Sequence, residues 1–181
     1  MLVIDTREKP PLYVGQLQAL LPGKTMMQAL SAGDYLYCYH PLGCGAVGNF
    51  VPEHVLVERK RVGDLISSFV ERNKAGYRRI TSQLERCTRK AGVVILLVEG
   101  HIEPGPSLGQ LVADGRLRQF PYTAIHGLLL SIQKELGVKV LWTNNQVETQ
   151  TLLVSLHSYL RKPEHGLWMT KTPDSLRRSA T

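Results

Sequence analysis

Hydrophobic residues along the chain form short continuous runs that alternate with segments in which apolar positions recur at helical spacing. The run Val93 to Val98 is rich in branched residues and is typical of a strand buried on both faces of a sheet. Similar runs predict strands at 2–5 and 138–142. Helical spacing predicts helices at the following places: 14–21, a segment from 62 to a break at 73–76, a segment carrying Ile80, Leu84 and Cys87, 122–136, and about 145–160. Strands that alternate with helices indicate an α/β fold.

A β-hairpin is predicted in the first third of the chain. Its arms are Tyr35 to Tyr39 and Val55 to Lys60, and its long tip spans Pro41 to Pro52. Side chains alternate along a strand, so Glu58 and Lys60 should share one face of the second arm. The glycine-rich stretch 104–120 contains Asp114-Gly115, which could turn a second, smaller hairpin.

These elements are expected to form one domain over residues 1–162, with an extended hairpin insertion at 38–54 and a basic, flexible tail at 163–181. The apolar runs are far shorter than a membrane span, and the first residues do not resemble a signal peptide. We therefore expect no membrane partner and a cytoplasmic or nucleoid-associated location in a microbe or phage, or a nuclear one in a eukaryote.

Charge favours an anionic partner. The formal net charge is +7, and ten of the 22 Lys and Arg residues fall between Arg59 and Lys90. A charge run is usually a solvated helix face, but this one adjoins an acidic motif, which favours contact with phosphate groups of DNA.

The acidic motif consists of Gly33-Asp34, directly before the first arm of the predicted hairpin, and Glu58-Arg59-Lys60 on the second arm. Hydrolysis of a phosphodiester needs a hard cation held by one or two carboxylates, and Asp34 and Glu58 supply that pair. A lysine beside them can orient the nucleophile or stabilise the transition state. The residues alone therefore indicate a metal-dependent phosphodiesterase.

With Asp64 added after three intervening residues that follow Lys60, the motif resembles the signature of XPF-type (ERCC4 domain) structure-specific endonucleases. The similarity extends from Leu2 to Arg161 and includes the Ser82-Gln83 pair of the second basic helix. It implies a restriction-endonuclease-like core, in which a central mixed β-sheet is flanked by helices. The chain after Leu160 is too short for a paired helix-hairpin-helix module, so the resemblance is to the nuclease core.

The resemblance implies a Mg²⁺- or Mn²⁺-dependent endodeoxyribonuclease that acts on branched, flap or single-stranded DNA in repair, recombination or replication. Metal binding is expected at Asp34, Glu58 and, as an accessory ligand, Asp5. The expected catalytic residues are Asp34, Glu58, Lys60, Asp5, Arg59 and Asp64. The expected DNA-binding residues are Arg7, Arg61, Arg72, Lys74, Arg78, Arg79 and Gln83. The alternative function is a non-catalytic DNA-binding module or a scaffold for a partner nuclease.

Several residues could have either a functional or a structural role. Asp64 could be catalytic, or could stabilise a helix start and pair with Arg59. Asp5 could be an accessory active-site residue or a turn residue, and Glu8 is expected to be exposed. His126 and His157 are expected to pack among apolar helical neighbours.

The hairpin insertion also admits more than one interpretation. Cys38, His40, Cys44 and His54 match no common zinc spacing, and three cysteines in all do not suggest a disulfide framework. Aromatic residues there could stack on unpaired bases, although they more often pack a core: Tyr35, Tyr37, Tyr39 and Phe50. A homodimer through the last two helices is a further expectation from the resemblance.

Overall fold

The computed structural model describes residues 1–8, 11–38, 51–72, 76 and 78–162, except the side chains of 11–13 and 51–53. Its main sheet has six strands in the order β2-β1-β3-β4-β5-β9. Their bounds are β1 Leu2–Asp5, β2 Thr25–Gln28, β3 Tyr35–Tyr37, β4 Val51–Arg61, β5 Ala91–Glu99 and β9 Lys139–Thr143. The sheet is mixed: β1 and β4 each pair antiparallel with β3, whereas β1–β2, β4–β5 and β5–β9 are parallel.

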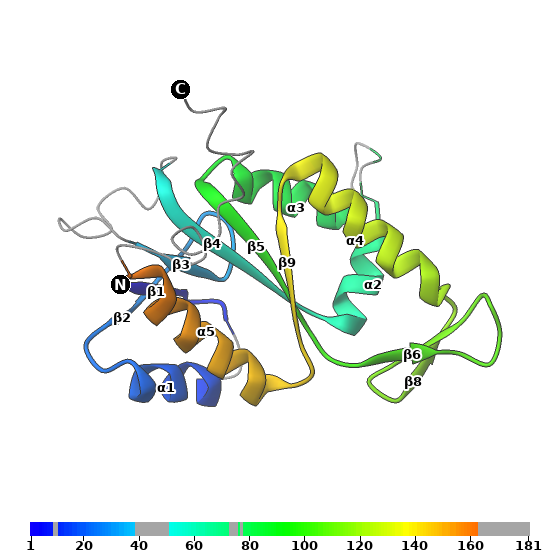
Figure 1. Ribbon diagram of the computed structural model, residues 1–181, viewed down its shortest axis with the longest axis horizontal. Coiled ribbons are helices and arrows are strands. Elements are labelled where there is room, and N and C mark those ends of the chain that lie inside the picture. Colours follow the sequence, from blue (N-terminus) through cyan, green and yellow to red (C-terminus); the bar gives the residue numbers. More distant parts are fainter. Residues whose placement is uncertain (9–10, 39–50, 73–75, 77, 163–181) are drawn as a thin grey trace, which may run out of the picture.

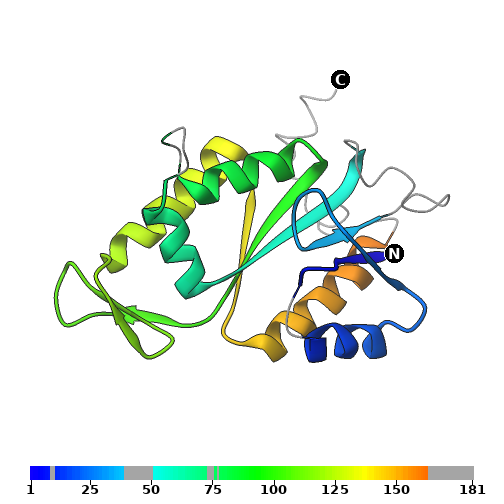
Figure 2. The same ribbon diagram turned by 180° about the vertical axis from the view of Figure 1, so that it is seen from behind.

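Five helices cover the two faces of this sheet. They are α1 Pro11–Leu20, α2 Val62–Val70, α3 Arg79–Thr88, α4 Tyr122–Leu136 and α5 Gln146–Leu160. Figure 1 shows α2, α3 and α4 on one face and α1 with α5 on the other, and the view from behind in Figure 2 agrees. The predicted α/β architecture of a central mixed sheet flanked by helices is therefore confirmed.

The alternation of side chains along the strands builds a separate core on each face. On β4, Leu56 points into the core under α2 to α4, whereas Val55 and Val57 point into the core under α1 and α5. Strand β5 divides in the same way, with Leu96 on the first side and Leu97 on the second, each 0% exposed. The prediction of a strand buried on both faces is confirmed for β5 between residues 94 and 98.

The predicted hairpin is also confirmed, because β3 pairs antiparallel with β4 in a register that places Tyr35 opposite Val57. Strand β4 starts at Val51, so the last residues of the expected 38–54 insertion are strand. Residues 39–50 lie outside the described part of the chain. Tyr35 and Tyr37 are 0% and 1% exposed, so they pack in the core and cannot stack on bases.

A second, three-stranded sheet follows β5 and has the order β6-β7-β8, with bounds Ile102–Pro104, Leu111–Ala113 and Arg116–Arg118. The turn between β7 and β8 is the predicted Asp114-Gly115 pair. Both residues have positive φ, 48° and 74°, which is the backbone of a type I′ turn. Both views place this small sheet at one end of the molecule, beyond the start of α2 (Figures 1 and 2).

The C-terminal helix begins with the predicted capping box. The Asn145 side chain accepts a 3.0 Å hydrogen bond from the Glu148 backbone N–H, and the Glu148 carboxylate accepts one from the Asn144 backbone. His157 packs as expected: it is 3% exposed and lies 6.5 Å from the Tyr37 ring. His126 is exposed and contacts only the edge of Tyr122, so its expected burial is wrong. Among the described residues, no helix is long and apolar enough to cross a membrane.

Candidate active site

The two candidate metal ligands are brought together by the connection into β3 and by the adjacent strand β4. Gly33 has φ +73°, and a Cβ built on it would lie 2.7 Å from Cγ of Leu56. Only glycine meets both requirements, and it lets the backbone turn tightly over β4. Asp34 then donates its N–H to the Val57 carbonyl at 2.8 Å, and its own carbonyl accepts from Asp5 N–H at 2.9 Å. Asp34 is thereby fixed between the ends of β1 and β3 and the middle of β4.

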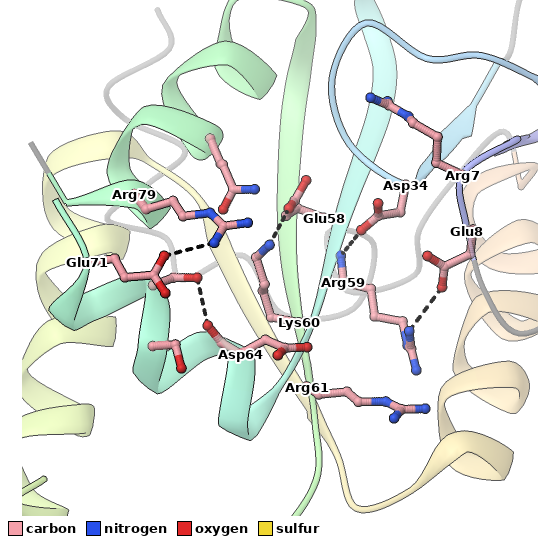
Figure 3. A pocket seen from close by; sticks show the side chains of 13 residues that line it. Arg7, Glu8, Asp34, Glu58, Arg59, Lys60, Arg61, Asp64, Glu71 and Arg79 are labelled. Atoms are coloured by element: carbon pink, nitrogen blue, oxygen red, sulfur yellow. Dashed lines mark hydrogen bonds and ion pairs between the residues drawn. The ribbon is translucent and has the colours of Figure 1, made fainter. Parts of the chain in front are cut away.

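Glu58 and Lys60 share one face of β4, as predicted. The Lys60 Nζ lies 3.1 Å from Glu58 Oε1, and the two side chains are 13% and 8% exposed. Figure 3 shows this pair beside Asp34, at one wall of a common pocket. The expected triad of two acids and one lysine is therefore assembled in a single place.

Burial makes ionisation of Asp34 costly. Desolvation, with added repulsion from the Glu58 and Glu8 carboxylates, raises the pKa of Asp34 to about 8, although the Arg59 N–H and the Lys60 charge act in the opposite direction. Two acids that repel each other in a shared cavity form an environment that a bound cation would stabilise. Such a strongly shifted carboxyl in a cleft is typical of a functional site.

Arg59 lines the pocket, but its side chain points away from Glu58 and Lys60, and its expected catalytic role stays a prediction. Its guanidinium donates to Glu99 at 3.0 and 2.6 Å and to Glu8 at 3.0 Å, and its side chain is only 7% exposed. Burial tends to lower the pKa of Arg59, but the hydrogen bonds and charge of Glu99 outweigh it and raise the pKa. Tyr35 also donates to Glu8 at 2.7 Å. The expectation that Glu8 is exposed is therefore wrong.

The backbone of Arg59 contacts the site directly. Its N–H donates to Asp34 Oδ2 at 2.7 Å, which orients the carboxylate. Asp64 lies exposed in the first turn of α2 and lines the same pocket, where a negative charge favours the helix start. The expected pairing of Asp64 with Arg59 is not formed, because Glu99 and Glu8 occupy that guanidinium.

Asp5 does not reach the pocket. Its side chain is 1% exposed and accepts hydrogen bonds from the backbone and guanidinium of Arg7 and from Leu30 N–H at 2.9 Å. Burial would raise the pKa of Asp5, but these hydrogen bonds outweigh it and lower the pKa. These contacts fit the turn-residue interpretation of Asp5, and its role as an accessory metal ligand stays a prediction.

The pocket around these groups has a volume of about 730 Å³ and a strongly polar wall. Four of the expected DNA-binding residues line it: Arg7, Arg61, Arg79 and Gln83. The amide Oε1 of Gln83 is buried and has no hydrogen-bond partner. The basic wall therefore comes from the loop after β1, from β4 and from α3 together (Figure 3).

The other expected DNA-binding residues are placed elsewhere. Arg72 donates to the Gly76 carbonyl at 2.7 Å, and Arg78 donates to the Phe69 carbonyl at 2.6 Å at the end of α2. Neither lines the pocket. These two arginines hold the connection between α2 and α3. Lys74 lies outside the described residues.

The pocket's donor set fits a hard divalent cation. Within the described ranges, no group of three or more His, Cys, Asp or Glu side chains is close enough to hold a metal ion. Mg²⁺, however, is commonly held by one or two carboxylates, with water and phosphate oxygens completing its shell. The carboxylates of Asp34 and Glu58, facing an open polar pocket, match that requirement.

The cysteines have two different states. Cys38 is disulfide-bonded, which the expectation of no disulfide framework did not include. Cys87 is free and buried, and desolvation together with the charges of Glu58 and Asp34 raises its pKa to about 12, which keeps the thiol protonated. His40 and Cys44 of the considered zinc set lie outside the described residues.

The sequence matches the family model of the ERCC4 domain over residues 4–156. Comparison with curated proteins gives no significant match.

Among solved structures, XPF from Aeropyrum pernix is similar with a TM-score of 0.60 at 19% identity, covering 98% of this chain and 69% of that one. XPF from Aeropyrum pernix in complex with DNA gives a TM-score of 0.62 at 21% identity, covering 90% of this chain and 66% of that one. These similarities show the fold. Since the family model spans most of the chain, the protein belongs to the ERCC4 domain family of DNA endonucleases and corresponds to its nuclease core.

Proposed function

We propose that this chain is a Mg²⁺- or Mn²⁺-dependent endonuclease that hydrolyses phosphodiester bonds in branched, flap or single-stranded DNA. The observation that carries the proposal is the convergence of Asp34, Glu58 and Lys60 in one pocket with a basic wall. One of the similar solved structures is an XPF in complex with DNA, which supports nucleic acid as the occupant of that wall. Work in repair, recombination or replication is part of the same proposal.

Asp34 and Glu58 would hold the divalent cation. When bound, that cation neutralises developing charge on the phosphate and lowers the pKa of a coordinated water. Asp34 must lose its proton to become a ligand, and the Arg59 N–H keeps its Oδ2 oriented. Glu58 is already paired with Lys60 and 6% exposed, so it is held in place before substrate arrives.

Lys60 supplies a positive charge within reach of the scissile phosphate. Its Nζ lies 3.1 Å from Glu58 and at the pocket wall, where it could stabilise the negative charge of the transition state or hold the attacking water. Arg79 and Gln83 on α3, with Arg7 and Arg61 across the pocket, would hold neighbouring phosphates. Arg79 is 57% exposed and also pairs with Glu71 at 2.8 Å.

The direct test incubates purified protein with labelled flap, fork, bubble and single-stranded DNA in Mg²⁺, Mn²⁺ or EDTA. The proposal expects cleavage with a metal and none in EDTA. Glu58→Gln should abolish cleavage, and Glu85→Gln, an exposed acid on α3 outside the pocket, is the matched control. Intact substrate in every metal, together with normal binding, would replace this proposal with the alternative of a non-catalytic DNA-binding module.

Two further expectations stay predictions. A homodimer through the last two helices would use α4 and α5, whose exposed apolar residues include Leu130, Val147 and Tyr159. Sedimentation of the purified chain would measure its oligomeric state. Location in the cytoplasm or nucleoid of a microbe or phage, or in the nucleus of a eukaryote, is the second of these predictions.

A further inference from the structure

A second basic cavity lies next to the candidate active site, between the start of α2 and the small sheet. It has a volume of about 260 Å³ and is lined by Arg61, Gly63, Ala113, Asp114, Arg116 and Arg118. Three of these six residues carry a positive charge and one carries a negative charge. The cavity is therefore suited to an anion.

The strand pairing of the small sheet explains why arginines gather there. On β7, Leu111 and Ala113 are 0% and 2% exposed and pack into the main core. Arg118 is opposite Leu111 and Arg116 is opposite Ala113, so both arginines share that inward face. Since β8 is the edge strand, its inward side chains reach past the core to the start of α2. There the Arg118 guanidinium lies 3.4 Å from where a Cβ on Gly63 would be.

The hydrogen bonding of these arginines is incomplete. Nε of Arg118 is buried and has no hydrogen-bond partner. Across the described part of the chain, neither Arg116 nor Arg118 forms an ion pair. The one carboxylate in the cavity belongs to Asp114 in the β7–β8 turn. Its Oδ1 accepts a 2.9 Å hydrogen bond from His101 N–H. A buried donor without a partner is costly in a folded protein, and an anionic oxygen would satisfy it.

The position of the cavity identifies the anion. Arg61 lines both this cavity and the pocket that holds Asp34, Glu58 and Lys60. Arg61 follows Lys60 directly and is the last residue of β4, so the two sites are neighbours along one wall of the molecule. A polymer of phosphates that occupied the first pocket would extend towards the second.

We propose that the cavity lined by Arg61, Arg116 and Arg118 binds a backbone phosphate of the same DNA molecule whose scissile phosphate occupies the active-site pocket. This inference rests on the proposed function for the identity of its ligand. The small sheet thus acts as a second point of attachment for the substrate strand, and it sets how many nucleotides separate the bound phosphate from the bond that is cut.

The test measures DNA binding in EDTA, where no cleavage occurs, for wild type and for Arg116→Gln/Arg118→Gln. The double variant should bind about tenfold more weakly, and the slope of log K against log salt should become less steep by about 1. The control is Lys134→Gln/Lys139→Gln, which removes two exposed charges near the opposite end of the sheet, where β9 begins. Thermal melting of each variant checks that the fold is retained.

A second arm locates the contact. In a set of oligonucleotides, each phosphate in turn is replaced by an uncharged methylphosphonate. One methylphosphonate, a fixed number of nucleotides from the cleavage position, should weaken DNA binding by the wild type about as much as the double substitution does. The same methylphosphonate should not weaken DNA binding by the double variant any further. The inference is overturned if the double variant binds with the affinity and salt slope of the control, or if every methylphosphonate weakens both proteins equally.

The two proposals fail separately. A protein that binds DNA through these arginines but never cuts it would disprove the proposed nuclease activity alone. A protein that cuts DNA with unchanged affinity after loss of both arginines would disprove only the second site.

Discussion

The backbone N–H of Arg59 donates a 2.7 Å hydrogen bond to Oδ2 of Asp34. Arg59, which lies between Glu58 and Lys60, therefore orients the carboxylate of Asp34. Its side chain meanwhile turns to the opposite face of β4 and is held by Glu99 and Glu8. One residue therefore joins the pocket to a buried ion-pair network. The position of Asp34 depends on that network.

Loss of the Arg59 guanidinium should destabilise the protein, because it removes the closest positive charge from two buried carboxylates, Glu8 and Glu99. Arg59→Ala is expected to lower the free energy of unfolding by about 3–5 kcal/mol in urea denaturation. The exposed pair Arg89–Glu85, with its atoms 3.5 Å apart, provides the control, and Arg89→Ala should cost less than about 1 kcal/mol. Equal costs for the two variants would show that the buried network contributes little.

Replacement of the Glu58 carboxylate should remove a metal ligand while preserving the shape of the side chain. Glu58→Gln is expected to lower the single-turnover cleavage rate by at least about 100-fold. DNA affinity in EDTA should stay within about threefold of wild type, because the variant removes no positive charge. Gel-based cleavage and fluorescence anisotropy measure the two quantities. Cleavage at an undiminished rate would assign the chemistry to another site.

Replacement of Lys60 should separate transition-state stabilisation from metal binding. Its Nζ competes with a cation for Glu58 Oε1, from which it lies 3.1 Å away. Lys60→Gln should therefore lower the cleavage rate about 100-fold without weakening Mg²⁺ affinity. Calorimetric titration with Mg²⁺ supplies the second measurement. A parallel loss of rate and Mg²⁺ affinity would contradict this division of roles.

Asp34 should make the metal-free protein less stable as the pH rises. Its folded pKa of about 8 exceeds the ordinary aspartate value of 3.8, so the folded state holds a proton that the unfolded state releases. The contribution of this proton to the free energy of unfolding is complete below about pH 4 and is lost as the pH rises through about 8. The neighbouring charges that affect the pKa of Asp34 are those of Glu58 and Glu8, which oppose its ionisation, and that of Lys60, which favours its ionisation.

Thermal melting in EDTA between pH 5 and pH 9 would reveal this dependence. In Asp34→Asn, melting temperature should fall less over that range, because the substituted amide does not titrate. Mg²⁺ should stabilise wild type more at pH 8 than at pH 6, since binding displaces the proton. Identical pH profiles for wild type and Asp34→Asn would contradict the raised pKa.

Asp5 should affect stability with the opposite dependence on pH. Its folded pKa is lowered, so its contribution to stability is present above the ordinary aspartate value of 3.8 and is lost as the pH falls through the folded pKa. Asp5→Asn is expected to cost about 1–3 kcal/mol near neutral pH. In urea denaturation, the difference from wild type should shrink below pH 4. Mg²⁺ affinity should fall less than in Asp34→Asn, and an equal loss would restore Asp5 as a ligand.

The sequence predicts the elements of this fold well because their signals are local. The helix ending at Leu136, the Asp114-Gly115 turn and the Asn145 capping box each depend on residues within a few positions of one another. The acids and lysine of the motif could be located because alternation along one strand fixes which face Glu58 and Lys60 occupy.

Errors arose where a side chain is held by a residue far along the chain. Glu8 resembles an ordinary loop residue until β4 brings Arg59 within 3.0 Å of it, 51 positions away. In the same way, the hydrogen bond from Leu30 N–H to Oδ2 of Asp5 joins residues 25 positions apart, and no local pattern predicts it. The cavity at Arg116 and Arg118 gave no sequence signal, because it requires the pairing of β8 with β7 and the proximity of α2.

The position of Gly33 links the active site to the hydrophobic core. A Cβ there would lie 2.7 Å from Leu56, whose side chain packs beneath α2. Gly33 and Leu56 are therefore not free to change independently. A larger residue at 33 would need both a smaller partner at 56 and a backbone that tolerates φ of +73°. Among relatives that keep this geometry, the two positions should vary together or remain unchanged.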